Sequence, residues 1–174
     1  ELALVDRVLA HTATDSRELA DAMTRRPVTD YLDPDRFAAE RAALFGDHPV
    51  AVGHVAQLPE PGRWFTQDLT PVPLLVTRDH EGHIRAFANV CRHRGARLCH
   101  QSDGQARRLT CPFHGWSYDL GGNLVGLLHP EGFDGLDRAT HGLMPVPVAE
   151  RHGLIFVRPR IGRAPVDLGT VLVG

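Results

Sequence analysis

The chain has 174 residues, of which 43% are hydrophobic and 23% charged, and its formal net charge at pH 7 is −2. This composition is typical of a globular domain and excludes a disordered chain, and the slight negative charge gives no basic field for nucleic acid. The longest apolar runs have only a few residues and no secretory pattern opens the chain, so neither a membrane span nor export is expected. One cytoplasmic domain with a short appendage is predicted.

Residues 1–46 are predicted to be helical. A run of cap-forming residues opens the segment 14–23, whose remaining residues favour a helix. Asp33 before Pro34 is typical of an N-cap followed by the first helical position, so a second helix is predicted over residues 34–45. This helical segment is expected to be an appendage of the domain that follows it.

Residues 47–160 are predicted to form an antiparallel β domain. Short runs rich in β-branched and aromatic residues alternate with turn signals. These runs are found at residues 50–55, 64–69, 72–77, 83–88 and 154–157. Glycine-containing polar segments at 79–82 and 121–123 lie beside them, as the turns of hairpins do. The predicted fold class is therefore mainly β, preceded by short N-terminal helices, and residues 161–174 are expected to begin a linker.

Two short boxes combine a cysteine with a histidine. Cys91 is followed two positions later by His93, and Cys111 is followed three positions later by His114. A zinc finger commonly takes a cysteine pair and then a histidine pair, whereas mixed boxes suit a two-iron cluster with both cysteines on one iron and both histidines on the other. Two imidazoles in place of thiolates raise the reduction potential of such a cluster. A zinc ion, or four ordinary core residues, are the alternatives.

Glycine and proline next to the boxes support a metal site. Gly95 and Gly115 follow the histidines closely, where a tight loop needs the conformational freedom of glycine, and Pro112 stiffens the second loop. Three cysteines cannot all pair within one chain, and nothing indicates secretion. Metal binding is therefore favoured over disulfide formation.

The residues around both boxes resemble a known family. The sequences C-R-H-R-G-A-R-L-C at Cys91–Cys99 and C-P-F-H-G-W-S-Y-D at Cys111–Asp119 are similar to the Rieske motif of ring-hydroxylating oxygenase α subunits. The resemblance extends over residues 30–160, with further similar segments at 52–59, 86–90 and 151–157. It implies an antiparallel Rieske-type β domain with a [2Fe-2S] cluster held in two loops. The cluster ligands that it implies are Cys91, His93, Cys111 and His114.

The same resemblance implies a role in an oxidoreductase. The chain would receive electrons from a ferredoxin or flavin reductase and pass them to a mononuclear Fe(II) in a C-terminal catalytic domain beyond residue 174. There dioxygen would hydroxylate the substrate, an aromatic ring in many relatives, so no catalytic residue is expected in this chain. His114 would face the catalytic iron of a neighbouring subunit in a trimer-type homo-oligomer. A freestanding Rieske-type ferredoxin is the alternative, and a zinc-stabilised module without a redox role is a third class.

Residues beside the ligands distinguish this chain from the respiratory Rieske proteins. Those proteins carry a disulfide across the cluster, but Ala96 and Phe113 stand at the two positions here. Cys99 is then an unpaired thiol, expected to be a small buried residue near the cluster, with a spare ligand as the alternative. Trp116 replaces a serine that donates to a cluster sulfur, which predicts a potential in the lower part of the Rieske range. Tyr118 is expected either to donate to a sulfur or to pack on a strand.

Arginines are abundant in and after the first box. Against one acid, Asp103, residues 91–108 contain Arg92, Arg94, Arg97, Arg107 and Arg108. A solvated surface with some salt bridges is one interpretation of this excess. A positive rim that steers an acidic electron donor onto the cluster is another, and contact with a neighbouring subunit is a third.

Overall fold

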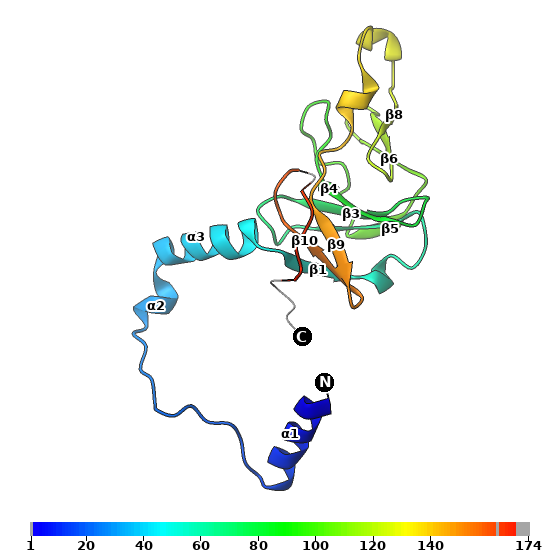
Figure 1. Cartoon of the computed structure of the whole chain (residues 1–174). Helices are drawn as coiled ribbons and strands as arrows, with labels where there is room; N and C mark the ends of the chain where they lie inside the picture. Colours follow the sequence, from blue (N-terminus) through cyan, green and yellow to red (C-terminus); the bar gives the residue numbers. More distant parts are fainter. Residues whose placement is uncertain (1, 163, 170–174) are drawn as a thin grey trace. The chain divides into compact units, whose positions relative to one another are not determined.

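A computed structural model describes residues 2–162 and 164–169 of the chain. The chain divides into two units, Glu1–Pro34 and Asp35–Gly174 (Figure 1). The first unit contains the helices α1 (Leu2–Ala13) and α2 (Thr29–Leu32). The helix α3 (Pro34–Ala42) starts at the boundary, and a wider helical turn, η1 (Ala43–Asp47), continues it.

The second unit is built from short antiparallel strands. In chain order these are β1 (Val50–His54), β2 (Arg63–Gln67), β3 (Leu74–Arg78), β4 (Ile84–Ala88), β5 (Asp103–Gln105), β6 (Arg108–Thr110), β7 (Ser117–Asp119), β8 (Leu124–Gly126), β9 (Val148–Arg151) and β10 (Leu154–Val157). Single helical turns are η2 (Val55–Gln57), η3 (Pro130–Phe133) and η4 (Arg138–His141). The predicted mainly β class is confirmed, and each predicted strand run contains one of β1, β2, β3, β4 and β10 or overlaps it.

The strands form three antiparallel sheets in the described part of the chain. Their strand orders are β1-β10-β9, β4-β3-β2-β5 and β6-β7-β8. Sheet β6-β7-β8 lies at the end of the second unit away from β1 and β10 (Figure 1). The strands β5 to β8 were not predicted, because three residues are too few to show an alternating pattern, and β9 was missed because Glu150 and Arg151 make up its second half.

Sheet β4-β3-β2-β5 has a core on each face. On β3, Leu74 and Val76 pack in the core shared with β1 and β10, whereas Leu75 between them packs in the core beneath the Cys-His boxes. This alternation follows from the period of two in a strand. The Thr77 hydroxyl donates to the Leu120 carbonyl at 2.7 Å, which ties β3 to the end of β7. The sheet therefore supports the boxes through the core that Leu75 shares with Cys91 and Cys111.

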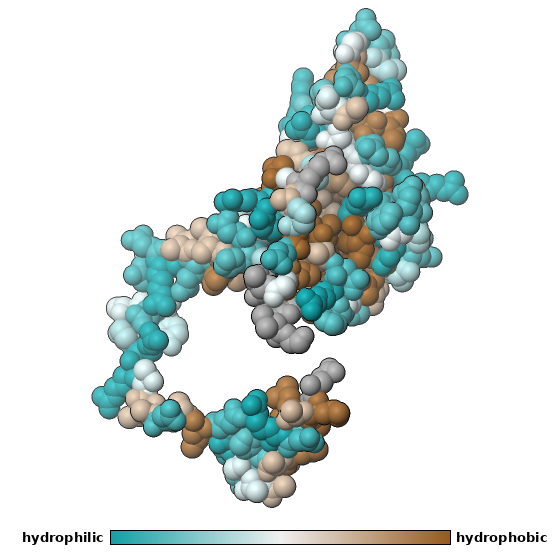
Figure 2. All heavy atoms as spheres, in the orientation of Figure 1, coloured by the Kyte–Doolittle hydropathy of each residue, from teal (hydrophilic) through white to brown (hydrophobic). Residues whose placement is uncertain are grey.

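No side chain of α1 is buried, and its apolar residues lie at the surface. Leu2, Leu4, Val5, Val8 and Leu9 are all exposed. Figure 2 shows brown apolar atoms at the surface of this segment. None of the helices in the described ranges combines the length and the apolar character that crossing a membrane requires.

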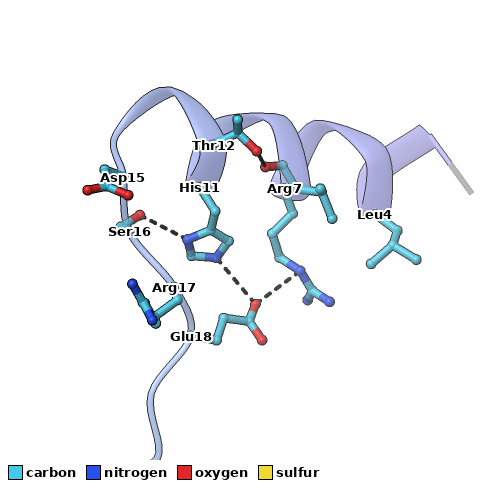
Figure 3. Close-up of a pocket in the computed structure, with 9 residues that line it drawn as sticks. Leu4, Arg7, His11, Thr12, Asp15, Ser16, Arg17 and Glu18 are labelled. Carbon is cyan, nitrogen blue, oxygen red and sulfur yellow. Dashed lines mark hydrogen bonds and ion pairs between the residues drawn. The ribbon is translucent and has the colours of Figure 1, made fainter.

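The helix predicted within residues 14–23 is absent, because its cap-forming residues end α1 instead. Asp15 has a φ of 48°, the left-handed conformation that commonly follows a helix. The Ser16 N–H donates to the His11 carbonyl at 3.0 Å, and the Asp15 N–H to the Thr12 carbonyl at 3.5 Å, which is the Schellman pattern of a helix C-terminus. The His11 ring also contacts the Ser16 hydroxyl and Glu18 (Figure 3). These contacts fold the following segment back along the helix.

Candidate metal centre

Two loops with the same hydrogen-bond frame present the four predicted ligands. In each loop the cysteine N–H donates to the carbonyl five positions later, and the N–H four positions later donates back to the cysteine carbonyl. The two N···O distances are 2.7 and 3.0 Å at Cys91, and 2.8 and 3.0 Å at Cys111. The fourth position is Gly95 or Gly115, with φ of 73° and 70°, where glycine is favoured. Boxes of different sequence therefore adopt one turn.

The two thiols of the loops are buried side by side. Cys91 and Cys111 are each only 2% exposed. Burial raises the pKa of the Cys91 thiol and the neighbouring Cys111 thiol adds to the rise, which hydrogen bonds from Tyr118 and the His93 backbone only partly oppose. The Cys91 thiol therefore keeps its proton unless a metal replaces it. The pair is suited to hold one metal ion.

The two imidazoles form a second pair. The rings of His93 and His114 are 4.7 Å apart between centroids. Nδ1 of His93 is buried and has no hydrogen-bond partner, which leaves this nitrogen available as a ligand atom. Burial, together with the charges of His114 and Arg94, lowers the pKa of His93. A neutral imidazole is the form that binds a metal.

The four side chains thus come together as a thiol pair and an imidazole pair. No three or more His, Cys, Asp or Glu side chains of residues 2–162 and 164–169 converge as around a single metal ion. Two irons with two protein ligands each match this pairwise arrangement, and the unpartnered Nδ1 of His93 supplies a free lone pair for one of them. The residues present therefore fit a [2Fe-2S] cluster.

Aromatic rings cover the His93 side of the site. The Trp116 ring stacks on His93 with centroids 5.0 Å apart and planes 9° apart. Phe133 meets His93 edge-on at 5.5 Å and Trp116 at 5.3 Å. The sequence analysis missed Phe133, because it lies in a polar turn and reaches the site only through the fold. The only sequence signal for Phe133 is that it is an aromatic residue in a segment of glycine and acidic residues, 131–135.

Tyr118 is a hydrogen-bond partner of a predicted ligand. Its hydroxyl oxygen accepts the Arg92 N–H at 3.0 Å and lies 3.4 Å from the Cys91 sulfur. Because the oxygen already accepts the N–H, its own O–H is left to donate to the sulfur. Burial, and then the Cys91 thiol, raise the pKa of Tyr118, so the hydroxyl keeps its proton. Of the two roles considered, donation to sulfur therefore has direct geometric support.

The third cysteine lies in the same core as the ligands. Cys99 is 5% exposed, and burial raises the pKa of its thiol to about 12, against a smaller opposing influence of Arg97. Its backbone, not its sulfur, makes the hydrogen bonds seen there. This agrees with the expectation of a small buried residue.

The predicted arginine rim divides into two kinds of residue. Arg92 and Arg94 are exposed at the turn of the first loop. Arg97 instead pairs with Asp68 at 2.8 Å and donates to the Cys99 carbonyl at 2.9 Å. The cations at the turn remain exposed, whereas Arg97 braces the loop.

The second loop is more apolar at its surface. Pro112 is exposed, and Phe113 is 64% exposed with its ring 4.1 Å from that of His114. Leu128 is exposed as well and lies against Gly115. His114 is therefore bordered by an exposed apolar surface.

Comparison with known proteins defines the class to which this fold and site belong. The family described as "Rieske [2Fe-2S] domain" matches residues 48–134, half of the 174 residues. The chain belongs to this family, and its cofactor is a [2Fe-2S] cluster.

The relatives that share this region are oxygenase subunits. A glycine betaine monooxygenase oxygenase subunit from Chromohalobacter salexigens is 40% identical over 131 residues, 75% of this chain and 29% of the relative. Biphenyl 2,3-dioxygenase subunit alpha from Rhodococcus jostii is 37% identical over 158 residues, 90% of this chain and 34% of the relative. The crystal structure of the quaternary ammonium Rieske monooxygenase CntA gives a TM-score of 0.72 at 27% identity, with 82% of this chain and 40% of that chain covered.

The resemblance stated from the two boxes is thus confirmed for the Rieske part of such subunits. This chain spans only 29% and 34% of the length of these two curated relatives.

Proposed function

We propose that this chain is the electron-transfer part of a Rieske oxygenase α subunit. The observation that carries the proposal is the pair of matched loops, which bring two buried thiols and two imidazoles together. The ligands would be Cys91, His93, Cys111 and His114. Residues 47–160 would form the Rieske domain, and residues 161–174 would begin the linker to a catalytic domain.

The protein side of the site would hold the cluster and control its surroundings. The bound cluster supplies one-electron transfer. Trp116 and Phe133 exclude water from one face of His93, and the Tyr118 hydroxyl donates to the Cys91 sulfur. A hydrogen bond to a ligand sulfur stabilises the more negative, reduced state.

Electrons would enter and leave at the exposed turns of the loops. A ferredoxin or flavin reductase would be the donor, and the exposed Arg92 and Arg94 would attract its acidic surface. His114, bordered by exposed Phe113, would face the acceptor, a mononuclear Fe(II) in the catalytic domain of a neighbouring subunit. A trimer-type homo-oligomer would bring the two together.

The reaction served would be dioxygen-dependent hydroxylation. The names of two relatives, a glycine betaine monooxygenase and a biphenyl dioxygenase, cover an aliphatic and an aromatic substrate. We therefore assign the class of reaction, with aromatic ring hydroxylation as one form of it. The substrate would be selected in the catalytic domain.

Anaerobic reconstitution of the purified chain tests the proposed site. We expect two irons and two acid-labile sulfides per chain, as the [2Fe-2S] family description requires, and the paramagnetic signal of a Rieske cluster after reduction. The signal should disappear when any one of the four ligands is replaced. Metal without sulfide, or one zinc ion per chain, would overturn the proposal.

Oxygen chemistry by the chain alone tests the division of labour. We expect the 174-residue chain to be reduced and reoxidised without oxygenating any of a panel of aromatic and aliphatic compounds. Activating dioxygen needs an iron with open coordination positions, such as a two-histidine, one-carboxylate site. Product formation coupled to electron supply in the purified chain would contradict this assignment.

A further inference from the structure

Asn89 is a buried polar residue beside the first ligand loop that the proposed function does not use. It follows directly on β4 and is 0% exposed. Its Nδ2 donates to the Cys99 carbonyl at 2.8 Å, and its Oδ1 accepts the Cys99 N–H at 2.9 Å. One carboxamide thus pairs with both backbone groups of a single residue, as a neighbouring strand would.

The backbone of Asn89 also makes hydrogen bonds at the base of the first loop. Its N–H donates to the Pro73 carbonyl at 2.7 Å, just before β3, and its carbonyl accepts the Leu98 N–H at 3.4 Å. Val90 and Arg97 form an isolated β-bridge directly above. The base of the first loop is therefore closed at Asn89 and anchored to the supporting sheet.

The second loop has a different base. It stands on the hairpin of β6 and β7, in which Arg108, Leu109 and Thr110 pair with Asp119, Tyr118 and Ser117. Under the first loop β4 ends at Ala88, and residues 97–102 returning from the loop belong to no strand. At the base of the first loop, the Asn89 side chain therefore makes the backbone hydrogen bonds that β6 and β7 make with each other at the base of the second loop.

We infer that Asn89 is a positioning residue for the cluster. It holds the returning arm of the first loop, and through it Cys91 and His93, at the spacing that the second loop requires. Arg97 also donates to the Cys99 carbonyl, but within the described residues the Cys99 N–H has Asn89 alone as its partner. Removing the carboxamide leaves that buried N–H unsatisfied and frees the loop to open. The inference rests on the proposed function, since it concerns the same cluster.

Asn89→Ala in the cluster-loaded chain tests the inference. The matched control is Thr70→Val, which removes another buried side-chain bond to the backbone, from the Thr70 hydroxyl to the Val72 carbonyl, in a segment that belongs to neither loop. Outer-shell substitutions weaken metal binding about 10–100-fold, so we expect Asn89→Ala to lose the cluster to a chelator at least about tenfold faster than the wild type. The control should lose it at the wild-type rate.

Two further readouts separate positioning from general stability. Asn89→Ala should shift the midpoint potential and the g values of the reduced cluster, whereas Thr70→Val should leave both unchanged even if its melting temperature falls. Hydrogen–deuterium exchange followed by mass spectrometry should speed up over residues 96–100 and stay unchanged over 110–117.

If Asn89→Ala does not fold, Asn89→Asp decides the question. It keeps the shape of the side chain but replaces the donor to the Cys99 carbonyl by an oxygen, so it should also release the cluster faster and shift the potential. Wild-type retention, potential and exchange in a folded Asn89 variant would overturn the inference. A wild-type chain that binds no sulfide-containing cluster would overturn the proposed function instead.

Discussion

The first ligand loop, residues 91–96, and the second, residues 111–116, share their backbone bonds but differ in their surroundings. His93 of the first loop lies against the rings of Trp116 and Phe133. His114 of the second loop lies against Phe113, which is mostly exposed. One turn geometry therefore occurs in two surroundings: His93 and His114 are both half-buried, but His93 stacks on the buried Trp116 ring whereas His114 lies beside the exposed Phe113 ring.

Replacing a thiol ligand in either loop should have the largest effect. We expect Cys91→Ala and Cys111→Ala each to abolish the cluster, because each removes one of the two cysteine sulfurs that we propose as ligands of the same iron. The measurement is iron and acid-labile sulfide together with the signal of the reduced cluster. Cys99→Ala is the control and should keep the cluster. If one of the two ligand variants kept it, the two loops would not be equal partners.

Replacing Trp116 should show how much the ring that covers His93 contributes to the free energy of unfolding and to the reduction potential. A buried tryptophan cut to a small residue costs about 3–5 kcal/mol of the free energy of unfolding, so Trp116→Ser should lose that much. The serine hydroxyl should also raise the reduction potential, by donating to the cluster. Denaturant unfolding and protein-film voltammetry measure the two effects. Phe113→Ser, at the exposed ring of the second loop, should change stability by less than about 0.5 kcal/mol.

Alanine at the two loop glycines compares the turns directly. A left-handed alanine costs about 1–2 kcal/mol, which we expect for Gly95→Ala, where an added Cβ has no heavy atom within 4 Å. At Gly115 that Cβ would lie 2.8 Å from Leu128, and such overpacking adds about 1–3 kcal/mol to the same cost. Thermal unfolding of both variants checks the order. Equal losses would show that Leu128 yields without cost.

Tyr118→Phe should have the smallest effect of the four. It removes the O–H that donates to Cys91 and the acceptor of the Arg92 N–H, so it disfavours the reduced cluster. A hydrogen bond worth about 0.5–1.5 kcal/mol corresponds to a fall in midpoint potential of roughly 20–65 mV. Protein-film voltammetry measures this shift. A raised potential would mean that the hydroxyl does not donate to the sulfur.

Much of the fold was predictable because its signals are local. The strands β1 to β4 and β10 were predicted from short apolar runs between turns. Five such runs were enough to predict a mainly β fold class. The helix placed within residues 14–23 was wrong for a physical reason. Threonine, aspartate and serine can satisfy the start of a helix or follow its end, and only the left-handed φ of Asp15 decides between them.

The site divides in the same way. Two local boxes predicted the four ligands. The structure pairs the two thiols and pairs the two imidazoles, while their binding of iron stays a prediction. Phe133 reaches His93 across forty residues of chain, which no local pattern records. From the local sequence Asn89 is typical of a turn. Its role depends on its contact with Cys99, ten residues later in the chain. Contacts of this kind exist only once the sheets have assembled.

The burial of Cys99 bears on the reactivity of the whole chain. A thiol with a pKa of about 12 has only about one molecule in 100,000 ionised at pH 7, and the thiolate is the species that alkylating agents and peroxides attack. Cys91 and Cys111 are each only 2% exposed, so none of the three thiols is accessible to such reagents in the folded chain. Uptake of iodoacetamide should therefore measure the fraction of chains that have unfolded.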